Sequence, residues 1–290
     1  MPLCCRCDVA MNETPFFFPN GACELFGVLH RPESAATGCG FVFCHPFAEE
    51  KLWAHRVYVS LARDLAARGH AVLRFDHMGH GDSDGEFVAA SVETHLSDIS
   101  AAVERLRESV AGLNRINLFG LRLGATFAAL AATRREDIDR LVLWEPVVEG
   151  GRYMQEVLRG NLTSQMAAYG RVLQDRKALV ESLQAGKPIN VDGYELGLAF
   201  YEQASSIDLL ARAGSFSGQV LILQAGKPGQ PPRKELVSLA EGYPDAHLEA
   251  LVEEPFWREI KPFYQRAEAL SAATLSWLDA PCDVREQAHG

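Results

Sequence analysis

One continuous segment constrains the fold of this chain more than any other. It begins with an apolar run, Ile116–Leu121, that is typical of a buried strand, and continues with an alanine-rich run, Thr126–Ala132, that is typical of a helix. Gly120 and Gly124 stand at the junction, with Arg122 midway between them. Such closely spaced glycines predict a sharp turn at which strand and helix approach each other closely. We expect Arg122 to lie at the centre of this turn.

Short apolar runs alternate with amphipathic helical patterns along most of the sequence. A turn at residues 19–21 joins two predicted strands at residues 16–18 and 24–30. Ser91 can cap a helix whose apolar positions recur in steps of three and four, which indicates a helix packed on a sheet. The other predicted elements are strands at residues 40–44, 71–75, 140–146, 219–226 and 247–252, and helices at residues 53–68, 231–243 and 261–280.

This alternation predicts an α/β fold with a doubly wound, mostly parallel sheet. The pattern changes between residues 147 and 218, where polar and aromatic residues show helical periodicity. We therefore expect residues 11–146 and 219–290 to form the α/β core and residues 147–218 to be a helical insertion. Residues 1–10 carry no periodic apolar face, so they are either a disordered tail or an extension ahead of a natural start at Met11.

The composition argues against several classes of partner. A net charge of −10 is unfavourable for binding nucleic acid or an anionic membrane surface. No apolar run approaches the ~18–20 residues of a membrane span, and no signal peptide opens the chain, so we expect a cytoplasmic protein. No Walker or Gly-x-Gly-x-x-Gly pattern predicts a nucleotide, and we expect no cofactor. The sequence does not specify an oligomeric state.

The seven cysteines do not predict a metal site. They lack paired Cys-x-x-Cys spacing, and Cys4, Cys5 and Cys7 have no further cluster to complete a coordination shell. Cys44 is followed by His45, which suggests a Cys–His dyad. Adjacent residues of a strand point to opposite faces, however, so we expect Cys44 to be a buried, small apolar residue.

Three motifs, in this order, resemble those of the α/β-hydrolase superfamily. They are His45-Pro46-Phe47, Asp76-x-x-Gly79-x-Gly81-x-Ser83 and Gly120-x-Arg122-x-Gly124. The third is similar to the nucleophile elbow of that superfamily, which normally reads Gly-x-Ser-x-Gly. The resemblance implies that the insertion at residues 147–218 is the lid. Residues 44–51 and 120–125 are most similar to proteins named exosortase-system-associated hydrolase 2, whose activity is unproven.

The same resemblance implies that the catalytic triad is missing. Arg122 stands at the position of the nucleophilic serine, and an arginine cannot attack a carbonyl group. The acid of the superfamily follows the strand predicted at residues 219–226, but Gly226-Lys-Pro-Gly229 contains no carboxylate. The histidine follows the last strand, where this chain has Glu253-Glu254-Pro255. One carboxylate remains, Glu145, at a position where some members place their acid.

Two compatible roles for Arg122 are open. A buried, unpaired charge is costly, so Arg122 should lie within about 4 Å of a carboxylate. Glu145 is the first choice of partner because both residues end neighbouring predicted strands, and Glu49 or Glu50 is the second. In the second role, which does not exclude the first, Arg122 is a receptor that binds a carboxylate or phosphate group through two parallel hydrogen bonds.

Further candidates surround the same turn. The resemblance implies an oxyanion hole formed by the backbone N–H groups of Leu123 and Phe47, since Pro46 has no N–H group. Glu49 and Glu50 precede the helix predicted at residues 53–68, where they either complement the helix dipole or activate a water molecule. His45 is a further candidate catalytic residue. His77 and His80 are expected near the rim as loop residues, and they are the only alternative bases. Ser83, a possible substitute nucleophile, is expected to be structural.

Two hypotheses of function follow. In the first, the chain hydrolyses an ester, thioester or amide that carries an anionic group, without a serine nucleophile. Arg122 would anchor the anion, and Glu49, Glu50 or Glu145 would act with a water molecule. In the second, the chain is a non-catalytic binding protein that serves an exopolysaccharide or surface-protein system, as the subfamily resemblance suggests. Both hypotheses require a small-molecule partner, and neither requires a metal.

Overall fold

The fold was analysed in a computed structural model that describes residues 13–32, 35–258 and 264–280. The predictions for residues 1–10, including the cysteines at positions 4, 5 and 7, lie outside the described residues. Among those that are described, Cys23, Cys39 and Cys44 are free thiols.

Eight of the described strands form one sheet with the order β1-β2-β4-β3-β5-β6-β9-β10. β1 and β2 pair as an antiparallel hairpin, β2 pairs antiparallel with β4, and all the remaining pairs are parallel. This arrangement confirms the predicted doubly wound, mostly parallel sheet. The strands are β1 (Glu13–Asn20), β2 (Cys23–His30), β3 (Cys39–Cys44), β4 (Ala71–Phe75), β5 (Arg115–Leu121), β6 (Ile138–Trp144), β9 (Gln219–Gly226) and β10 (Ala246–Val252).

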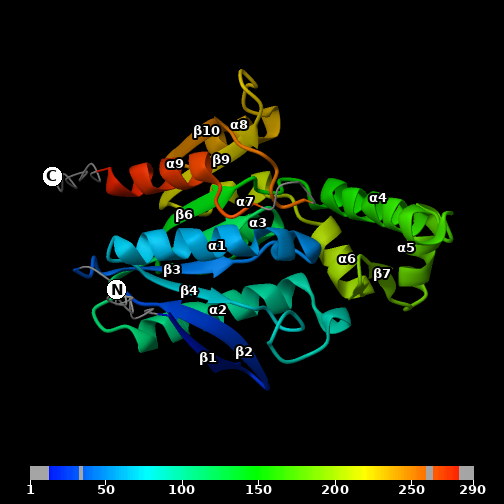
Figure 1. Cartoon of the computed structure of the whole chain (residues 1–290), viewed down its shortest axis with the longest axis horizontal. Helices are drawn as coiled ribbons and strands as arrows, with labels where there is room; N and C mark the ends of the chain where they lie inside the picture. The colour runs from blue at the N-terminus through cyan, green and yellow to red at the C-terminus, as the bar shows by residue number, and fades with distance from the viewer. Residues whose placement is uncertain (1–12, 33–34, 259–263, 281–290) are drawn as a thin grey trace, which may run out of the picture.

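Helices cover both faces of this sheet (Figure 1). On one face, α1 and α9 pack on the aromatic side chains of the central strands, such as Phe43, Phe119 and Trp144. On the other face lie α2, α3 and α8, together with much of the insertion. The core helices are α1 (Glu49–Ala67), α2 (Val92–Ser109), α3 (Leu123–Ala132), α8 (Lys234–Gly242) and α9 (Glu268–Asp279), with a 3₁₀ turn, η1 (Phe87–Ala89). No helix in the described ranges is long and apolar enough to cross a membrane.

The segment between β6 and β9 projects from one end of the sheet, at the right of Figure 1. Its elements are α4 (Gly150–Tyr169), α5 (Arg176–Gln184), β7 (Ile189–Val191), β8 (Tyr194–Leu196), α6 (Leu198–Ser205) and α7 (Leu210–Ala213). Its two ends meet, because an antiparallel bridge joins Glu149 to Asp208. The Gly150 N–H group donates to the Ile207 carbonyl at 2.9 Å, and the Leu209 N–H group donates to the Val148 carbonyl at 2.9 Å. We call residues 148–150 and 207–209 the stalk.

Several predicted elements differ from the structure. Helix α1 begins at Glu49 rather than at residue 53, so Glu49 and Glu50 form its first turn. The insertion is not wholly helical, because β7 and β8 form a hairpin whose turn is Asp192-Gly193, with positive φ at both residues. Helices α8 and α9 begin after the first residues predicted for them. Ser91 caps α2 as predicted, and its hydroxyl accepts from the Thr94 N–H group.

Candidate functional site

Arg122 occupies a sharp turn between β5 and α3. Its backbone has φ 55° and ψ −126°, a conformation that is strained for a residue with a side chain. The flanking glycines make the turn possible. A Cβ atom on Gly120 would lie 2.5 Å from backbone atoms of Gly124 and Ala125, and one on Gly124 would lie 2.4 Å from the carbonyl oxygen of Cys44. The predicted close approach of strand and helix is therefore confirmed.

A second turn of the same kind ends the neighbouring strand. Ala48, which precedes α1, has φ 49° and ψ −125°. Because β3 and β5 are adjacent parallel strands, α1 and α3 begin side by side at the carboxyl edge of the sheet. This edge is where open α/β sheets usually bind their ligands. The two turns bring Glu50, in the first turn of α1, next to Arg122.

A cavity of about 560 Å³ lies over these two turns, between the core and the insertion. Aromatic, acidic and basic side chains predominate in its lining. The lining residues are Phe47, Ala48, Glu49, Glu50, Trp53, Arg122, Tyr153, Glu156, Val157, Arg159, Gly160, Thr163, Val191, Asp192, Trp257 and Arg258. We call this space the main cavity. Its volume is in the range of small-molecule binding sites.

The Arg122 side chain is buried and is held from several sides. Its Nε atom donates to Glu50 Oε1 at 3.1 Å, and its Nη2 atom lies 3.7 Å from Glu156 Oε2. The guanidinium carbon lies 5.4 Å from the centre of the Tyr153 ring and 5.9 Å from that of Trp257. Arg122 therefore contacts α1, α4 and the segment after β10.

Glu145 is not the partner of Arg122, so the first choice from the sequence is wrong and the second, Glu50, is confirmed. The Glu145 carboxylate accepts from the Arg233 guanidinium at 2.6 Å and from the Ala225 N–H group at 2.8 Å. The physical reason is the backbone at Glu145, where a φ of 50° turns the side chain toward β9 and the start of α8. Glu145 is absent from the lining of the main cavity.

Burial and mutual contacts shift the pKa values of the groups around Arg122. Burial raises the pKa of Glu50, although Arg122 and the hydroxyl of Tyr153, which donates to Glu50 at 3.1 Å, oppose that shift. Burial alone would lower the pKa of Arg122, but the charge and the hydrogen bond of Glu50, together with Tyr153 and Glu145, more than offset this effect and raise it. Burial also raises the pKa of Tyr153, so its hydroxyl stays protonated. The Arg122–Glu50 pair is thus a buried ion pair with a third hydrogen-bonding partner.

The two backbone amides expected to form an oxyanion hole have no hydrogen-bond partner among the described residues. Leu123 is the first residue of α3, and Phe47 ends the segment that leads into α1. Phe47 lines the main cavity, and its ring stacks on Phe200 at 4.5 Å. Leu123 does not line the cavity. Neither N–H group is thus used within the described fold, but only Phe47 belongs to the lining of the main cavity.

Cys44 and His45 are buried away from the cavity. The Cys44 side chain lies in the core, and burial raises the pKa of its thiol. The His45 ring stacks on Tyr58 at 4.6 Å. Burial, together with positive charges such as that of Lys51, lowers the pKa of His45 far below its ordinary value. Neither residue lines the main cavity, so His45 does not join the group around Arg122.

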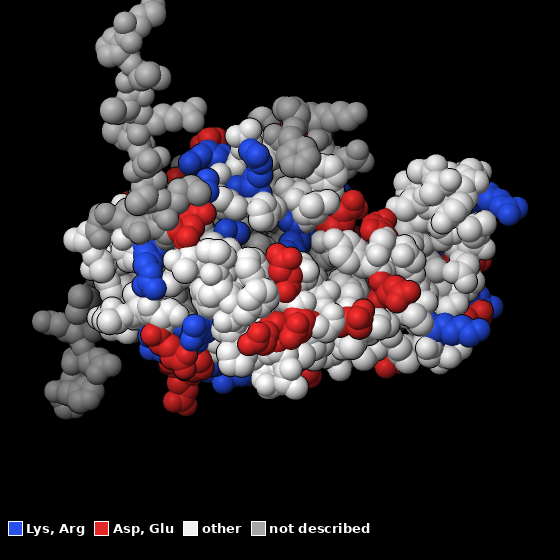
Figure 2. All heavy atoms as spheres, turned by 60° about the horizontal axis from the view of Figure 1, so that its bottom comes forward, with Lys and Arg blue, Asp and Glu red and all other residues white. Residues whose placement is uncertain are grey.

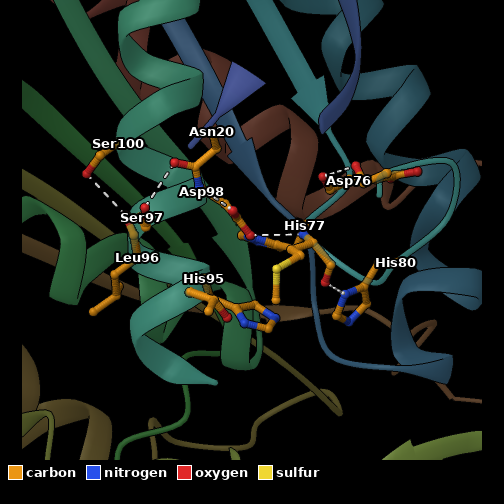
Figure 3. A network of polar contacts seen from close by, with 12 residues as sticks. Asn20, Asp76, His77, His80, His95, Leu96, Ser97, Asp98 and Ser100 are labelled. Atoms are coloured by element: carbon orange, nitrogen blue, oxygen red, sulfur yellow. Dashed lines mark hydrogen bonds and ion pairs between the residues drawn. The ribbon is translucent and has the colours of Figure 1, made fainter. Parts of the chain in front are cut away.

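His77 and His80 were expected at the rim, but the structure places them inside the protein (Figure 3). His77 Nδ1 lies 3.2 Å from Asp98 Oδ2, and His80 Nδ1 contacts the Met78 carbonyl at 3.0 Å. The rings of His77 and His95 lie 4.4 Å apart. Burial lowers the pKa of His80 to about 4. These histidines hold the loop after β4 against α2 and do not reach the main cavity.

Ser83 has a structural role in the same loop, as expected. Its hydroxyl donates to the Asp76 carbonyl at 2.6 Å and accepts from the Phe26 N–H group at 2.8 Å. The hydroxyl thus donates one hydrogen bond and accepts another, and these two bonds join the loop to β2.

The surface charge agrees with the acidic composition. Figure 2 shows acidic side chains across the middle of one face, with basic side chains between and beside them rather than gathered in one patch. The described part of this face therefore offers no continuous basic surface of the kind that nucleic acids require.

Comparison with known proteins identifies the family. The family model for serine aminopeptidases of the S33 type matches residues 41–226, which is more than half of the chain. The chain belongs to this family. The comparison with curated proteins found no match for this S33 member.

Solved structures show that this S33 member has the α/β-hydrolase fold. Est1E from Butyrivibrio proteoclasticus, determined with ferulic acid bound, is 19% identical with a TM-score of 0.66, over 91% of this chain and 100% of that one. A proline iminopeptidase from Mycobacterium smegmatis is 16% identical with a TM-score of 0.62, over 91% and 97%. The mouse α/β-hydrolase domain-containing protein 10 is 16% identical with a TM-score of 0.56, over 92% and 97%.

Three residues at the centre of the site could not be found from the sequence of this S33 member. Tyr153 and Glu156 come from α4, and Trp257 follows β10. The number of aromatic residues in the insertion was a signal for Tyr153, but it does not indicate which of them face the core.

Proposed function

We propose that this chain is an S33-family protein that works without a serine nucleophile and binds a small organic molecule with an anionic group in the main cavity. One observation carries the proposal: the described lining of the cavity contains no serine, cysteine or histidine. Serine and cysteine hydrolases require such a nucleophile beside a base. Here the corresponding place belongs to the ion pair of Arg122 and Glu50.

The guanidinium geometry supports binding of an anion. Arg122 donates to Glu50 through Nε, and neither Nη atom donates a hydrogen bond to a described residue. Glu156, at 3.7 Å, is a distant and partly exposed partner that a ligand can replace. Tyr153 and Trp257 hold the guanidinium plane in place. A carboxylate or phosphate group can therefore accept two parallel hydrogen bonds from the Nη atoms.

A second candidate function, hydrolysis by an activated water molecule, is favoured by one observation. Burial raises the pKa of Glu50, which makes its carboxylate a better base, and this side chain lines the cavity. Glu50 would accept a proton from water as the oxygen attacks an ester carbonyl. The N–H groups of Phe47 and Leu123 would bind the resulting oxyanion, and the alcohol would leave with the proton returned by Glu50. Glu49, in the same turn of α1, is the alternative base.

The biological setting is proposed from sequence similarity alone. We infer that the protein is of the exosortase-system-associated hydrolase 2 type and acts in the cytoplasm for an exopolysaccharide or surface-protein system. In the same proposal, Arg122 replaces the elbow serine, and residues 147–218 act as a lid. The contacts of Arg122 with Tyr153 and Glu156 of α4 support that lid role.

Ferulate and its methyl ester test both candidate functions in one experiment. Est1E binds ferulic acid, and the aromatic lining of the main cavity suits such a ring. We expect ferulate to bind in calorimetry, neutral methyl ferulate to bind more weakly, and R122K to weaken ferulate binding at least tenfold. The control variant R171Q, outside the cavity lining, should bind like the wild type. Equal binding of ferulate by wild type and R122K would overturn the assignment of Arg122.

Turnover distinguishes the two candidates. Fluorophosphonate probes should label no serine, and R122S should not gain esterase activity, because the histidine and the acid of a serine triad are also absent from their positions. Release of ferulate from methyl ferulate by the wild type, lost in E50Q, would establish the second candidate instead of the first. Stoichiometric labelling of any serine would contradict both.

A further inference from the structure

A second cavity, of about 350 Å³, lies at the opposite edge of the sheet. Its walls come from the starts of β3, β5 and β6, from the end of α1 and from the end of α9. The lining residues are Thr37, Cys39, Phe41, Arg68, His70, Arg115, Asn117, Asp139, Arg140, Leu278, Asp279 and Ala280. Because the main cavity lies at the carboxyl ends of the strands, the two cavities share no lining residue.

Three guanidinium groups give this second cavity a positive character. Arg115, Arg140 and Arg68 all act on His70 and lower its pKa, in addition to the larger effect of burial and against the opposing charge of Asp279. His70 is therefore neutral near pH 7, and its Nδ1 atom contacts the Thr37 hydroxyl at 2.9 Å.

The carboxylates of the cavity do not neutralise all three arginines. Asp279 lies 3.7 Å from Arg68, and Asp139 lies 3.9 Å from Arg140. Arg115 makes no ion pair with any described residue and is exposed. Its guanidinium is therefore free to bind an oxyanion.

A buried acceptor in the same cavity lacks a donor. Asn117 is almost fully buried; its Nδ2 atom donates to the Gly40 carbonyl at 3.1 Å, and its Oδ1 atom has no partner. An irregularity in the pairing of β5 with β6 places Asn117 opposite Arg140 and leaves Asp139 as the extra residue. Such bulges re-aim side chains and are frequent beside functional sites. Buried polar atoms are nearly always satisfied, so Asn117 Oδ1 indicates a missing donor.

We propose that the second cavity binds a small phosphate monoester that carries a hydroxyl group. The phosphate would accept hydrogen bonds from Arg115 and its neighbours Arg68 and Arg140, as guanidinium groups commonly bind phosphate. The hydroxyl group of the ligand would donate to Asn117 Oδ1. This site is independent of the function proposed for the main cavity.

Calorimetry on the full chain tests the proposal with glycerol 3-phosphate, inorganic phosphate and glycerol. Glycerol 3-phosphate should bind with one site per chain, and the affinity should fall as salt is added. R115Q should weaken binding at least tenfold, whereas R171Q, which belongs to the lining of neither cavity, should not change it. N117A should weaken glycerol 3-phosphate more than inorganic phosphate, because only the former offers the carbon-borne hydroxyl group.

Three outcomes would overturn the proposal. One is the absence of saturable binding of glycerol 3-phosphate by the wild type. Another is a loss of affinity for glycerol 3-phosphate in R115Q that is no greater than the loss in R171Q. Arg115 is exposed, so its replacement should leave the fold intact and the comparison valid. The third is loss of binding in R122K with retention in R115Q, which would place the ligand in the main cavity.

Discussion

Breaking the Arg122–Glu50 pair should destabilise the protein far more than breaking a surface ion pair. Only 10% of the Arg122 side chain and 18% of the Glu50 side chain are exposed, and the Nε to Oε1 distance is 3.1 Å. At an effective dielectric constant of about 20, two unit charges at that distance attract by roughly 5 kcal/mol. Desolvation offsets part of this gain, but removing one partner leaves the other charge buried, at a cost of about 3–5 kcal/mol.

We expect unequal effects from the two single variants. R122M should lose about 3 kcal/mol of unfolding free energy, at the lower end because Tyr153 still donates to Glu50. E50Q should lose about 2 kcal/mol, because Glu156 stays near the guanidinium. The double variant should lose less than the sum, with a coupling energy of about 2 kcal/mol.

Urea denaturation at pH 7 measures all four states of this cycle. Lys177 and Glu181 provide a matched control, since their side chains form a 3.7 Å pair while 85% and 61% exposed. K177M should cost no more than about 0.5 kcal/mol. A coupling energy near zero between R122M and E50Q, or a cost of R122M equal to that of K177M, would refute a buried ion pair at the centre of this site.

Two further predictions concern the scaffold. G124A should destabilise the protein by about 3 kcal/mol or prevent folding, because its Cβ atom would lie 2.4 Å from the carbonyl oxygens of Cys44 and His45. The control G160A, in a helix with open space around it, should stabilise by about 0.5–1 kcal/mol in the same denaturation assay; similar effects of the two would contradict this account. Stability should also fall as the pH drops from 6.5 toward 4, because the unfolded chain binds a proton at His80 that the folded chain, with its pKa of about 4, does not. The shift in the pKa of His80 corresponds to about 3 kcal/mol of unfolding free energy. The difference in unfolding free energy between wild type and H80Q should therefore change by that amount between pH 7 and pH 4. A difference that stays constant over this range would exclude the proposed role of His80.

The fold could be predicted from the sequence because its determinants are local. The apolar run of β5 and the close glycines at 120 and 124 define the central turn without reference to distant residues. The β7–β8 hairpin was missed because its strands have only three residues each. Its turn, Asp192-Gly193, is nevertheless a strong hairpin signal that could have been used.

The site was less predictable because it depends on backbone angles that the sequence pattern does not show. Glu145 ends the strand beside Arg122, yet its positive φ directs the carboxylate to Arg233. Glu50 reaches Arg122 because α1 begins directly after a similar turn at Ala48. The order of the strands therefore predicted the correct edge of the sheet for the site, but it predicted Glu145 instead of Glu50 as the partner of Arg122.

The stalk has a consequence for how this protein can be remodelled. The stalk pairs the segment that follows β6 with a segment that precedes β9, so the residues between the two halves of the stalk form one closed loop. The entropy of closing such a loop rises only slowly with its length. A change in the length of residues 151–206 therefore costs little closure entropy, provided that the new segment still covers the core where Leu158 and Phe200 are buried. Such an exchange would also replace the walls of the main cavity that Tyr153 and Asp192 supply, and with them the ligand range of the chain.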